Sequence, residues 1–173
     1  MHSNSPNFRL LQAIFVLILM TGLTSACVSV NLGGGKGPER SKGAKFSAPG
    51  GPFQPLPKTP ADAAWQNPSN GNSISYLSTC NESADPGLET ATEEIIAVLG
   101  DTKTLTQRRY MFDGRAALDT EAEAKVEGVP TKIRTLVFKK NACLYTLSLL
   151  GVTQTFADDQ KYFDQFVKGF SAP

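Results

Sequence analysis

Three cysteines and a single histidine are the residues of this sequence best suited to nucleophilic, redox or metal chemistry. They are Cys27, Cys80, Cys143 and His2. A thiolate is a nucleophile, a disulfide partner and a metal ligand, and histidine is the usual general base and the commonest metal ligand. The stretch of chain around each residue decides which of these roles is open to it.

Cys27 ends an N-terminal stretch that is built like an export signal. Arg9 provides a basic start, residues 10–20 are mostly apolar, and the small residues 24–26 lead directly into the cysteine. This pattern is typical of a secretory signal peptide and is too short for a transmembrane helix, which needs about 20 apolar residues. A cysteine at the cleavage site resembles the signal of bacterial lipoproteins, which implies cleavage after residue 26 and acylation of Cys27. The alternative is an ordinary secretory signal with Cys27 near the cut by chance.

The lipoprotein interpretation assigns roles to the other two cysteines. Loss of residues 1–26 removes His2, and it leaves Cys80 and Cys143 as a pair in an oxidising compartment. Two remaining cysteines favour one disulfide. Across a loop of roughly sixty residues, this bond would stabilise the folded state by about 4 kcal/mol on the chain-entropy model. Two separate buried thiols are the alternative. A metal site made of two cysteines without histidine is less favoured, so we predict no metal and no cofactor.

The charge balance argues against a nucleic-acid partner. The chain has 17 basic and 16 acidic residues, and removal of Arg9 with the signal leaves 16 of each sign. A nucleic-acid binder shows a clear basic excess or stripe, which is absent here. No nucleophile-elbow, phosphate-loop, dinucleotide or zinc-protease motif occurs in a suitable context, so we predict no catalytic residue and no enzyme activity.

Four short charged pairs are the remaining candidates for chemistry. Asp158–Asp159 and Glu93–Glu94 could do acid–base work if buried together, but neighbours on a helix point in different directions and are usually solvated. Arg108–Arg109 with Tyr110, and Lys139–Lys140, could dock anionic lipid headgroups or an acidic partner. Plain solvent-exposed surface is the alternative that we favour for both basic pairs.

Residues 27–60 have the composition of a tether. Most of this segment is glycine, proline and polar residues, with few large apolar side chains. Such a chain cannot bury enough apolar surface to offset its ordering entropy, so we expect a disordered linker after the lipidated cysteine. A proline-rich docking ligand for another protein is the alternative interpretation. The folded domain is expected over residues 61–173.

Hydrophobic periodicity predicts an α+β domain with a twisted antiparallel sheet of about six strands and two helices packed on it. Residues 115–127 are rich in alanine and glutamate, which favours a helix, but apolar and polar residues alternate with period two, so we assign a strand. Strands are expected near Trp65 and at 73–77, 102–112, 115–127, 131–139 and 142–150, with helices at 87–99 and 155–170. Turns are expected at Asp113–Gly114, Glu127–Gly128 and Lys140–Asn141.

Residues 61–173 resemble PsbP-like domains, which are small α/β/α sandwiches. The likeness rests on three antiparallel strands, the sequence Tyr145-Thr146-Leu147 in a central strand, and a closing helix with Phe166 and Phe170. The resemblance implies the fold and supplies no catalytic residue, because these positions belong to the core. A group of uncharacterised bacterial lipoproteins is similar in its tryptophan and cysteine pattern.

Two functions remain as hypotheses. The first is a non-enzymatic, membrane-anchored envelope lipoprotein whose domain binds another envelope protein or contributes to an assembly. The second is a carrier of a lipid or small ligand in a cleft between the sheet and the C-terminal helix. Val28 and Ser29 follow the acylated cysteine without an aspartate, so outer-membrane attachment is expected.

Overall fold

The computed structural model describes residues 39–80 and 85–173. The predicted signal peptide, Cys27 and residues 28–38 lie outside the described residues. The elements are β1 (Gln54–Pro55), β2 (Ala63–Gln66), β3 (Ser73–Cys80), α2 (Leu88–Ala97), β4 (Thr102–Phe112), β5 (Arg115–Val126), β6 (Val129–Lys140), β7 (Cys143–Val152) and α3 (Phe156–Lys168). In the described ranges, no helix is both long and apolar enough to span a bilayer.

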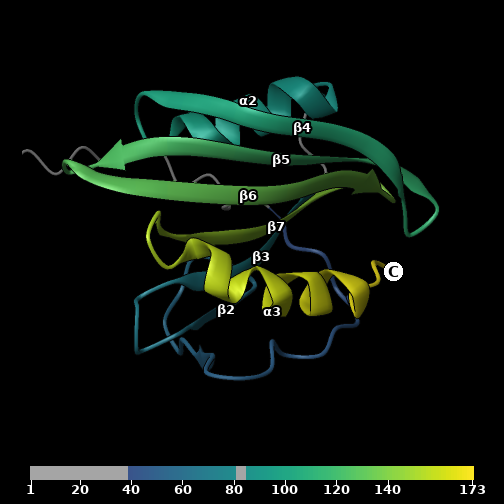
Figure 1. Ribbon diagram of the computed structural model, residues 1–173. Coiled ribbons are helices and arrows are strands. Elements are labelled where there is room, and N and C mark those ends of the chain that lie inside the picture. Colours follow the sequence, from purple (N-terminus) through teal and green to yellow (C-terminus); the bar gives the residue numbers. More distant parts are fainter. Residues whose placement is uncertain (1–38, 81–84) are drawn as a thin grey trace, which may run out of the picture. The chain divides into compact units, whose positions relative to one another are not determined.

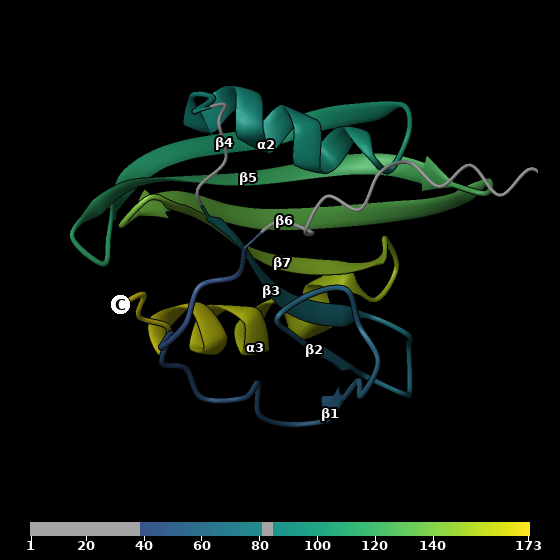
Figure 2. The same ribbon diagram turned by 180° about the vertical axis from the view of Figure 1, so that it is seen from behind.

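Seven strands form one antiparallel sheet in the order β1-β2-β3-β7-β6-β5-β4. Helix α2 packs on β5 and β6 from one side, and α3 packs on the other side, over β7 (Figures 1 and 2). The predicted α+β class and its antiparallel sheet are confirmed. The strand beyond the predicted six is β1, a two-residue piece paired with β2.

Strand β5 shows why alternation outweighs helix propensity here. Neighbouring residues point to opposite faces, so Leu118 and Ala122 pack beneath α2 while Ala117 belongs to the core on the α3 side. The residues in the middle of β5 are buried on both faces because each face is covered at that point. A helix of the same residues would bury only one stripe and could not pair with β4 and β6.

The strands β4 to β7 are joined by three two-residue turns. Asp113–Gly114, Glu127–Gly128 and Asn141–Ala142 all have positive φ at both positions, as type I′ hairpin turns require. The third turn lies one residue later than the predicted Lys140–Asn141. Ala142 adopts φ 58° although alanine rarely does, because the pairing of Lys140 with Cys143 fixes the loop at two residues.

The main core lies between α3 and the sheet and consists largely of aromatic side chains. Phe156, Phe163 and Phe166 of α3 are at most 1% exposed, and they meet Phe138 and Tyr145 of the sheet, which are fully buried. Phe138 and Tyr145 stack with ring centroids 5.0 Å apart. The interface between sheet and C-terminal helix is therefore filled by side chains.

A row of polar residues crosses the face of the sheet on which α2 packs. The row crosses five neighbouring strands in register and consists of Gln107, Thr120, Thr135, Ser148 and Ser75. It separates two small apolar clusters beneath α2, one around Leu118 and Val137 and one around Ala122 and Ile133. The hydroxyls of Thr92, on α2, and of Thr135 are buried without a hydrogen-bond partner in the described part of the chain.

We expect Thr135→Val to raise the free energy of unfolding by about 1 kcal/mol, because it removes a buried hydroxyl that lacks a partner while preserving shape. The matched control is Thr120→Val in the neighbouring strand. Thr120 Oγ1 accepts a hydrogen bond from Gln107 Nε2 at 3.2 Å, so removal of this hydroxyl should not raise the free energy of unfolding. Urea denaturation of both variants measures the difference, and equal effects would contradict the assignment.

The N-terminal segment 39–60 lies on the domain, which corrects the prediction of a disordered linker up to residue 60. Phe53 is 7% exposed in the core, and Phe46 contacts the rings of Trp65 and Phe166 with centroids 5.7 and 6.0 Å away. The segment is extended and pairs with strands near both of its ends. Burial of two aromatic side chains is therefore enough to hold it on the domain without a core of its own. The folded unit therefore begins before Ala61.

Candidate functional site at the disulfide-bonded end of the sheet

Cys80 and Cys143 form a disulfide, as predicted for this pair. They face each other in register at the ends of β3 and β7, with Cα atoms 4.0 Å apart. The backbone N–H of Cys80 points away from β7 and donates to the carbonyl of Glu39 at 2.8 Å. The two cysteines are thus a non-hydrogen-bonded pair, in which side chains of antiparallel strands approach most closely.

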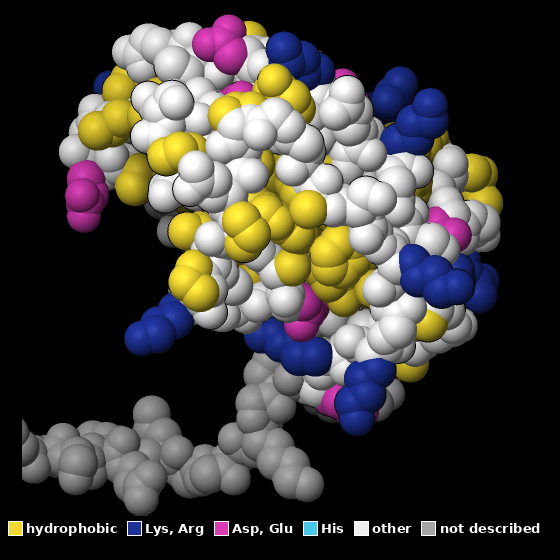
Figure 3. Space-filling view, turned by 90° about the horizontal axis from the view of Figure 1, so that it is seen from below, with side chains coloured by type: hydrophobic (Ala, Val, Ile, Leu, Met, Phe, Trp, Pro, Cys, Tyr) yellow, Lys and Arg dark blue, Asp and Glu magenta, His cyan; other side chains and the backbone are white. Residues whose placement is uncertain are grey.

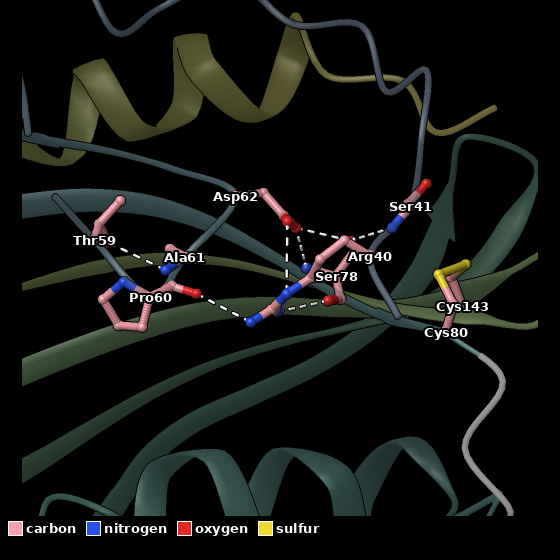
Figure 4. A network of polar contacts seen from close by, with 9 residues as sticks. All are labelled: Arg40, Ser41, Thr59, Pro60, Ala61, Asp62, Ser78, Cys80 and Cys143. Atoms are coloured by element: carbon pink, nitrogen blue, oxygen red, sulfur yellow. Dashed lines mark hydrogen bonds and ion pairs between the residues drawn. A yellow bond between two sulfur atoms is a disulfide. The ribbon is translucent and has the colours of Figure 1, made fainter. Parts of the chain in front are cut away.

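Arg40 secures the N-terminal segment to the sheet beside the disulfide (Figure 4). Its Nη1 donates to the Ser78 carbonyl at 2.7 Å, its Nη2 donates to the Pro60 carbonyl at 3.0 Å, and its Nε lies 3.8 Å from Asp62 Oδ1. Asp62 Oδ2 in turn accepts from the N–H and the hydroxyl of Ser78 at 2.5 and 2.7 Å. Every nitrogen of the guanidinium is therefore engaged within the domain.

An open depression of about 360 Å³, lined by both polar and apolar groups, lies between this segment and the disulfide. Arg40, Lys42 and Asn141 line it together with Tyr145, whose hydroxyl is 2.7 Å from Ser41 Oγ. The described residues hold no group of three or more potential metal ligands. The wall of the depression offers hydrogen-bonding groups and charges of both signs, since Glu39 lines it together with Arg40 and Lys42, and it offers no paired nucleophile and base. These hydrogen-bonding and charged groups are suited to contact with a polar surface of another molecule.

On the neighbouring hairpin, Asp113 holds the C-terminal end of the domain. Its Oδ2 accepts from Lys140 Nζ and from the Ala172 N–H, both at 2.9 Å. Burial by itself would raise the pKa of Asp113, but the hydrogen bonds from Lys140 and Ala172 outweigh it and lower the pKa below its ordinary value. The carboxylate form is thus the form that the fold stabilises.

This shift predicts a pH dependence of stability. Because the pKa of Asp113 is lower in the folded state, its contribution is fully present above the ordinary aspartate pKa of about 4 and is lost as the pH falls through the lowered value. We expect the free energy of unfolding of Asp113→Asn to fall less steeply with acidification than that of the wild type. Urea denaturation from pH 6 to about pH 2 measures both slopes, and parallel slopes would refute the expectation.

The basic pairs singled out in the sequence are not clustered by the fold. Lys140 is bound to Asp113, and Lys139 is paired with Asp85. Arg108 and Arg109 lie on β4, where they pair with different partners, Asp119 and Glu89. Their side chains remain 72% and 53% exposed, so they are the more accessible of the two pairs.

The acidic pairs separate as expected for neighbours on helices. Glu93 and Glu94 are exposed on α2, and Asp158 is exposed on α3. Asp159 is 2% exposed and accepts hydrogen bonds from the side-chain amides of three asparagines in the β2–β3 turn. This buried carboxylate holds the turn against α3.

A second charged cluster lies where α3 meets β5 and β6. Arg134 donates to both carboxylate oxygens of Asp119 at 3.0 and 2.9 Å and to Asp164 Oδ1 at 2.8 Å. These hydrogen bonds, above all those that Arg134 donates to Asp119, raise the pKa of Arg134 above its ordinary value despite burial. Its guanidinium also lies over the ring of Phe163, 5.4 Å from the centroid. The cluster fixes α3 on the sheet.

Sequence reasoning missed Arg40, Asp62 and Ser78. Arg40 lies in a glycine- and proline-rich stretch, Asp62 precedes the first predicted strand, and Ser78 lies just beyond the strand predicted at 73–77. Their contacts join positions up to 38 residues apart.

On the side formed by the N-terminal segment, apolar side chains gather near the middle of the surface, with lysine and arginine mainly towards its margin (Figure 3).

The chain matches no protein-family model and no curated protein sequence. Its structure is similar to that of LpqN, described as involved in cell envelope biogenesis of Mycobacterium tuberculosis, with a TM-score of 0.59 and 14% identity over 80% of this chain and 88% of that one. It is also similar to cyanobacterial PsbP from Synechocystis sp. PCC 6803, with a TM-score of 0.50 and 14% identity over 82% of this chain and 99% of that one. The domain therefore has a PsbP-like fold.

Proposed function

We propose that this protein is a bacterial envelope lipoprotein anchored by acylation of Cys27. The export signal that ends at Cys27 supports the anchor, and the Cys80–Cys143 disulfide supports an oxidising compartment outside the cytosol. LpqN, which shares the fold, is involved in envelope biogenesis in its own organism. Val28 and Ser29 after the acylated residue favour attachment to the outer membrane.

We further propose that the domain is a non-enzymatic module that binds another envelope protein. The observation that carries this is the filled interface between α3 and the sheet, where Phe163 and Phe166 are at most 1% exposed. A carrier needs an apolar cavity there, and those side chains occupy the space. The charged groups of Arg40 and Arg134 are committed to structural pairs, so chemistry on a substrate has no support from them.

The disulfide-bonded end of the sheet fits the role of load-bearing attachment. Glu39, the first residue that the structure describes, pairs with Cys80 and lies on the chain that leads from the proposed anchor. Tension on the linker is thereby delivered to β3, and the disulfide passes it to β7 in the middle of the sheet. Arg40 adds a second connection through Ser78 and Asp62. A tethered domain can thus be pulled without being unravelled from its N-terminal end.

The anchor is tested with the full-length chain produced in a bacterium that processes lipoproteins. Cells are labelled with an alkyne analogue of palmitate, and membranes are separated on a density gradient. We expect the wild type to be labelled and to sediment with the outer membrane, and Cys27→Ser to be unlabelled. Cys80→Ala is the matched control and should keep its label. A labelled Cys27→Ser variant would refute the proposal.

The binding role is tested by crosslinking in cells, purification in mild detergent and mass spectrometry of everything retained. A protein partner in stoichiometric amount supports the proposal. A bound lipid or metabolite without a protein partner would overturn it and support the carrier.

A further inference from the structure

Strand β4 forms one outer edge of the sheet over its full length of 11 residues. Its neighbour is β5, and nothing in residues 39–80 and 85–173 is strand-paired with its other side (Figure 1). The opposite edge is β1, which is only two residues long. An open edge presents backbone N–H and C=O groups in a row, which is a template for another strand. Of the two edges, β4 alone is long enough to take a full strand.

The turn at Asp113–Gly114 determines which backbone groups of β4 point outward. In a two-residue type I′ hairpin the flanking residues, here Phe112 and Arg115, exchange both ladder hydrogen bonds. The direction then alternates residue by residue along the regular part of the strand, which runs from Thr106 to Phe112 after a β-bulge. The backbone groups that point outward belong to Gln107, Arg109 and Met111.

The side chains along this edge carry one sign of charge. Strand β4 contains Lys103, Arg108 and Arg109 and no acidic residue. Arg108 and Arg109 are adjacent, so they project to opposite faces of the sheet and would flank an added strand on both sides. Their ion pairs with Asp119 and Glu89 are solvent-exposed at the arginine end and therefore weak, so a partner's carboxylates can replace them.

We infer that β4 is the docking edge for an extended acidic segment of the partner protein, which adds to the sheet as an eighth strand. This inference rests on the proposed binding function and names its surface. Backbone hydrogen bonds to Gln107, Arg109 and Met111 hold the segment, and adjacent acidic side chains opposite Arg108 and Arg109 select it. A second copy of β4 is the wrong partner, because it would bring three basic side chains from each copy to one edge.

The first test uses a synthetic peptide of about nine residues, an ordinary strand length, with two adjacent glutamates at its centre between threonine and valine. Hydrogen exchange of the amides is followed by NMR on the full chain in detergent. At a peptide concentration of about ten times Kd, the amides of Gln107, Arg109 and Met111 should exchange about tenfold more slowly. The same peptide with lysines in place of the glutamates should bind at least about tenfold more weakly. Protection elsewhere, or equal binding of both peptides, would overturn the inference.

The second test removes one outward hydrogen bond without touching the ladder to β5. Met111→Pro eliminates the outward N–H at an edge position, where proline is tolerated, and the side chain of Met111 is 68% exposed. It should weaken glutamate-peptide binding about tenfold, while the matched control Met111→Ala keeps wild-type affinity. Loss of affinity in both variants, or in neither, counts against strand addition.

The same pair of variants separates this inference from the proposed function. If crosslinking in cells retains a stoichiometric protein partner and Met111→Pro retains as much of it as Met111→Ala, the function stands and the docking edge is wrong. If no protein partner is retained by the wild type, the proposed function itself fails.

Discussion

Replacing Cys80 and Cys143 together by alanine is expected to lower the free energy of unfolding by about 4 kcal/mol. The disulfide closes a loop with a sequence separation of 63, and the chain-entropy model assigns a loss of this size to opening it. The loss is large compared with the usual total stability of a domain, about 5–15 kcal/mol. The unfolding transition in urea without reductant measures it.

The wild-type chain in reductant provides the control for this prediction. Its unfolding midpoint should fall to that of the double variant, whereas the double variant should not respond to reductant. Cys27→Ala, which leaves the disulfide intact, should unfold like the oxidised wild type. An oxidised wild type and a double variant with the same midpoint would show that the disulfide contributes no stability.

Asp159→Ala is expected to cost about 3–5 kcal/mol, because it leaves buried amide donors without an acceptor. The Nδ2 atoms of Asn67, Asn70 and Asn72 lie 3.1, 2.8 and 2.8 Å from Asp159 Oδ2. Asn72 is fully buried, and Gly151 makes room for it, since a Cβ there would lie 2.0 Å from Asn72 Oδ1. The turn between β2 and β3 is thus fastened to α3 through one carboxylate.

Asp158→Ala is the matched control for this substitution. Asp158 precedes Asp159 in the first turn of α3 and is exposed, so its loss removes only a favourable interaction with the helix dipole, about 0.3–1 kcal/mol. Equilibrium urea denaturation compares the two variants. Equal losses would mean that the asparagine contacts contribute nothing beyond the dipole effect.

The elements with a strong local pattern were predicted from the sequence. Strand β5 and helix α3 follow periods of two and of about 3.6 residues, which depend only on the geometry of the backbone. Counting favoured a disulfide between Cys80 and Cys143, because these two thiols remain if Cys27 is the anchor, and the structure contains this bond. The turns at Asp113–Gly114 and Glu127–Gly128 were found from their glycines, and only the Asn141–Ala142 turn, which has none, was displaced by one residue.

The parts that were missed depend on contacts between distant residues. Residues 39–60 have a composition typical of disorder, and their order comes from aromatic residues of the sheet and α3, on which Phe46 and Phe53 pack. Arg40 looks like any charged residue of a linker until β3 supplies the Ser78 carbonyl as its acceptor. Composition describes what a segment can bury by itself, and it holds no information on what a neighbouring surface offers.

The sequence by itself determined the fold class and most of the secondary structure, because both follow from local spacing, and it favoured a Cys80–Cys143 disulfide over two separate thiols. The tertiary structure decided which charges are committed to structural pairs and which remain available. Lys140 and Asp159 are bound inside the domain, whereas Arg108 and Arg109 stay exposed on an open edge. The exposure of Arg108 and Arg109 arises because β3 pairs with β7 and not with β4, a contact between distant segments that no local pattern encodes, and this pairing leaves β4 at the edge of the sheet.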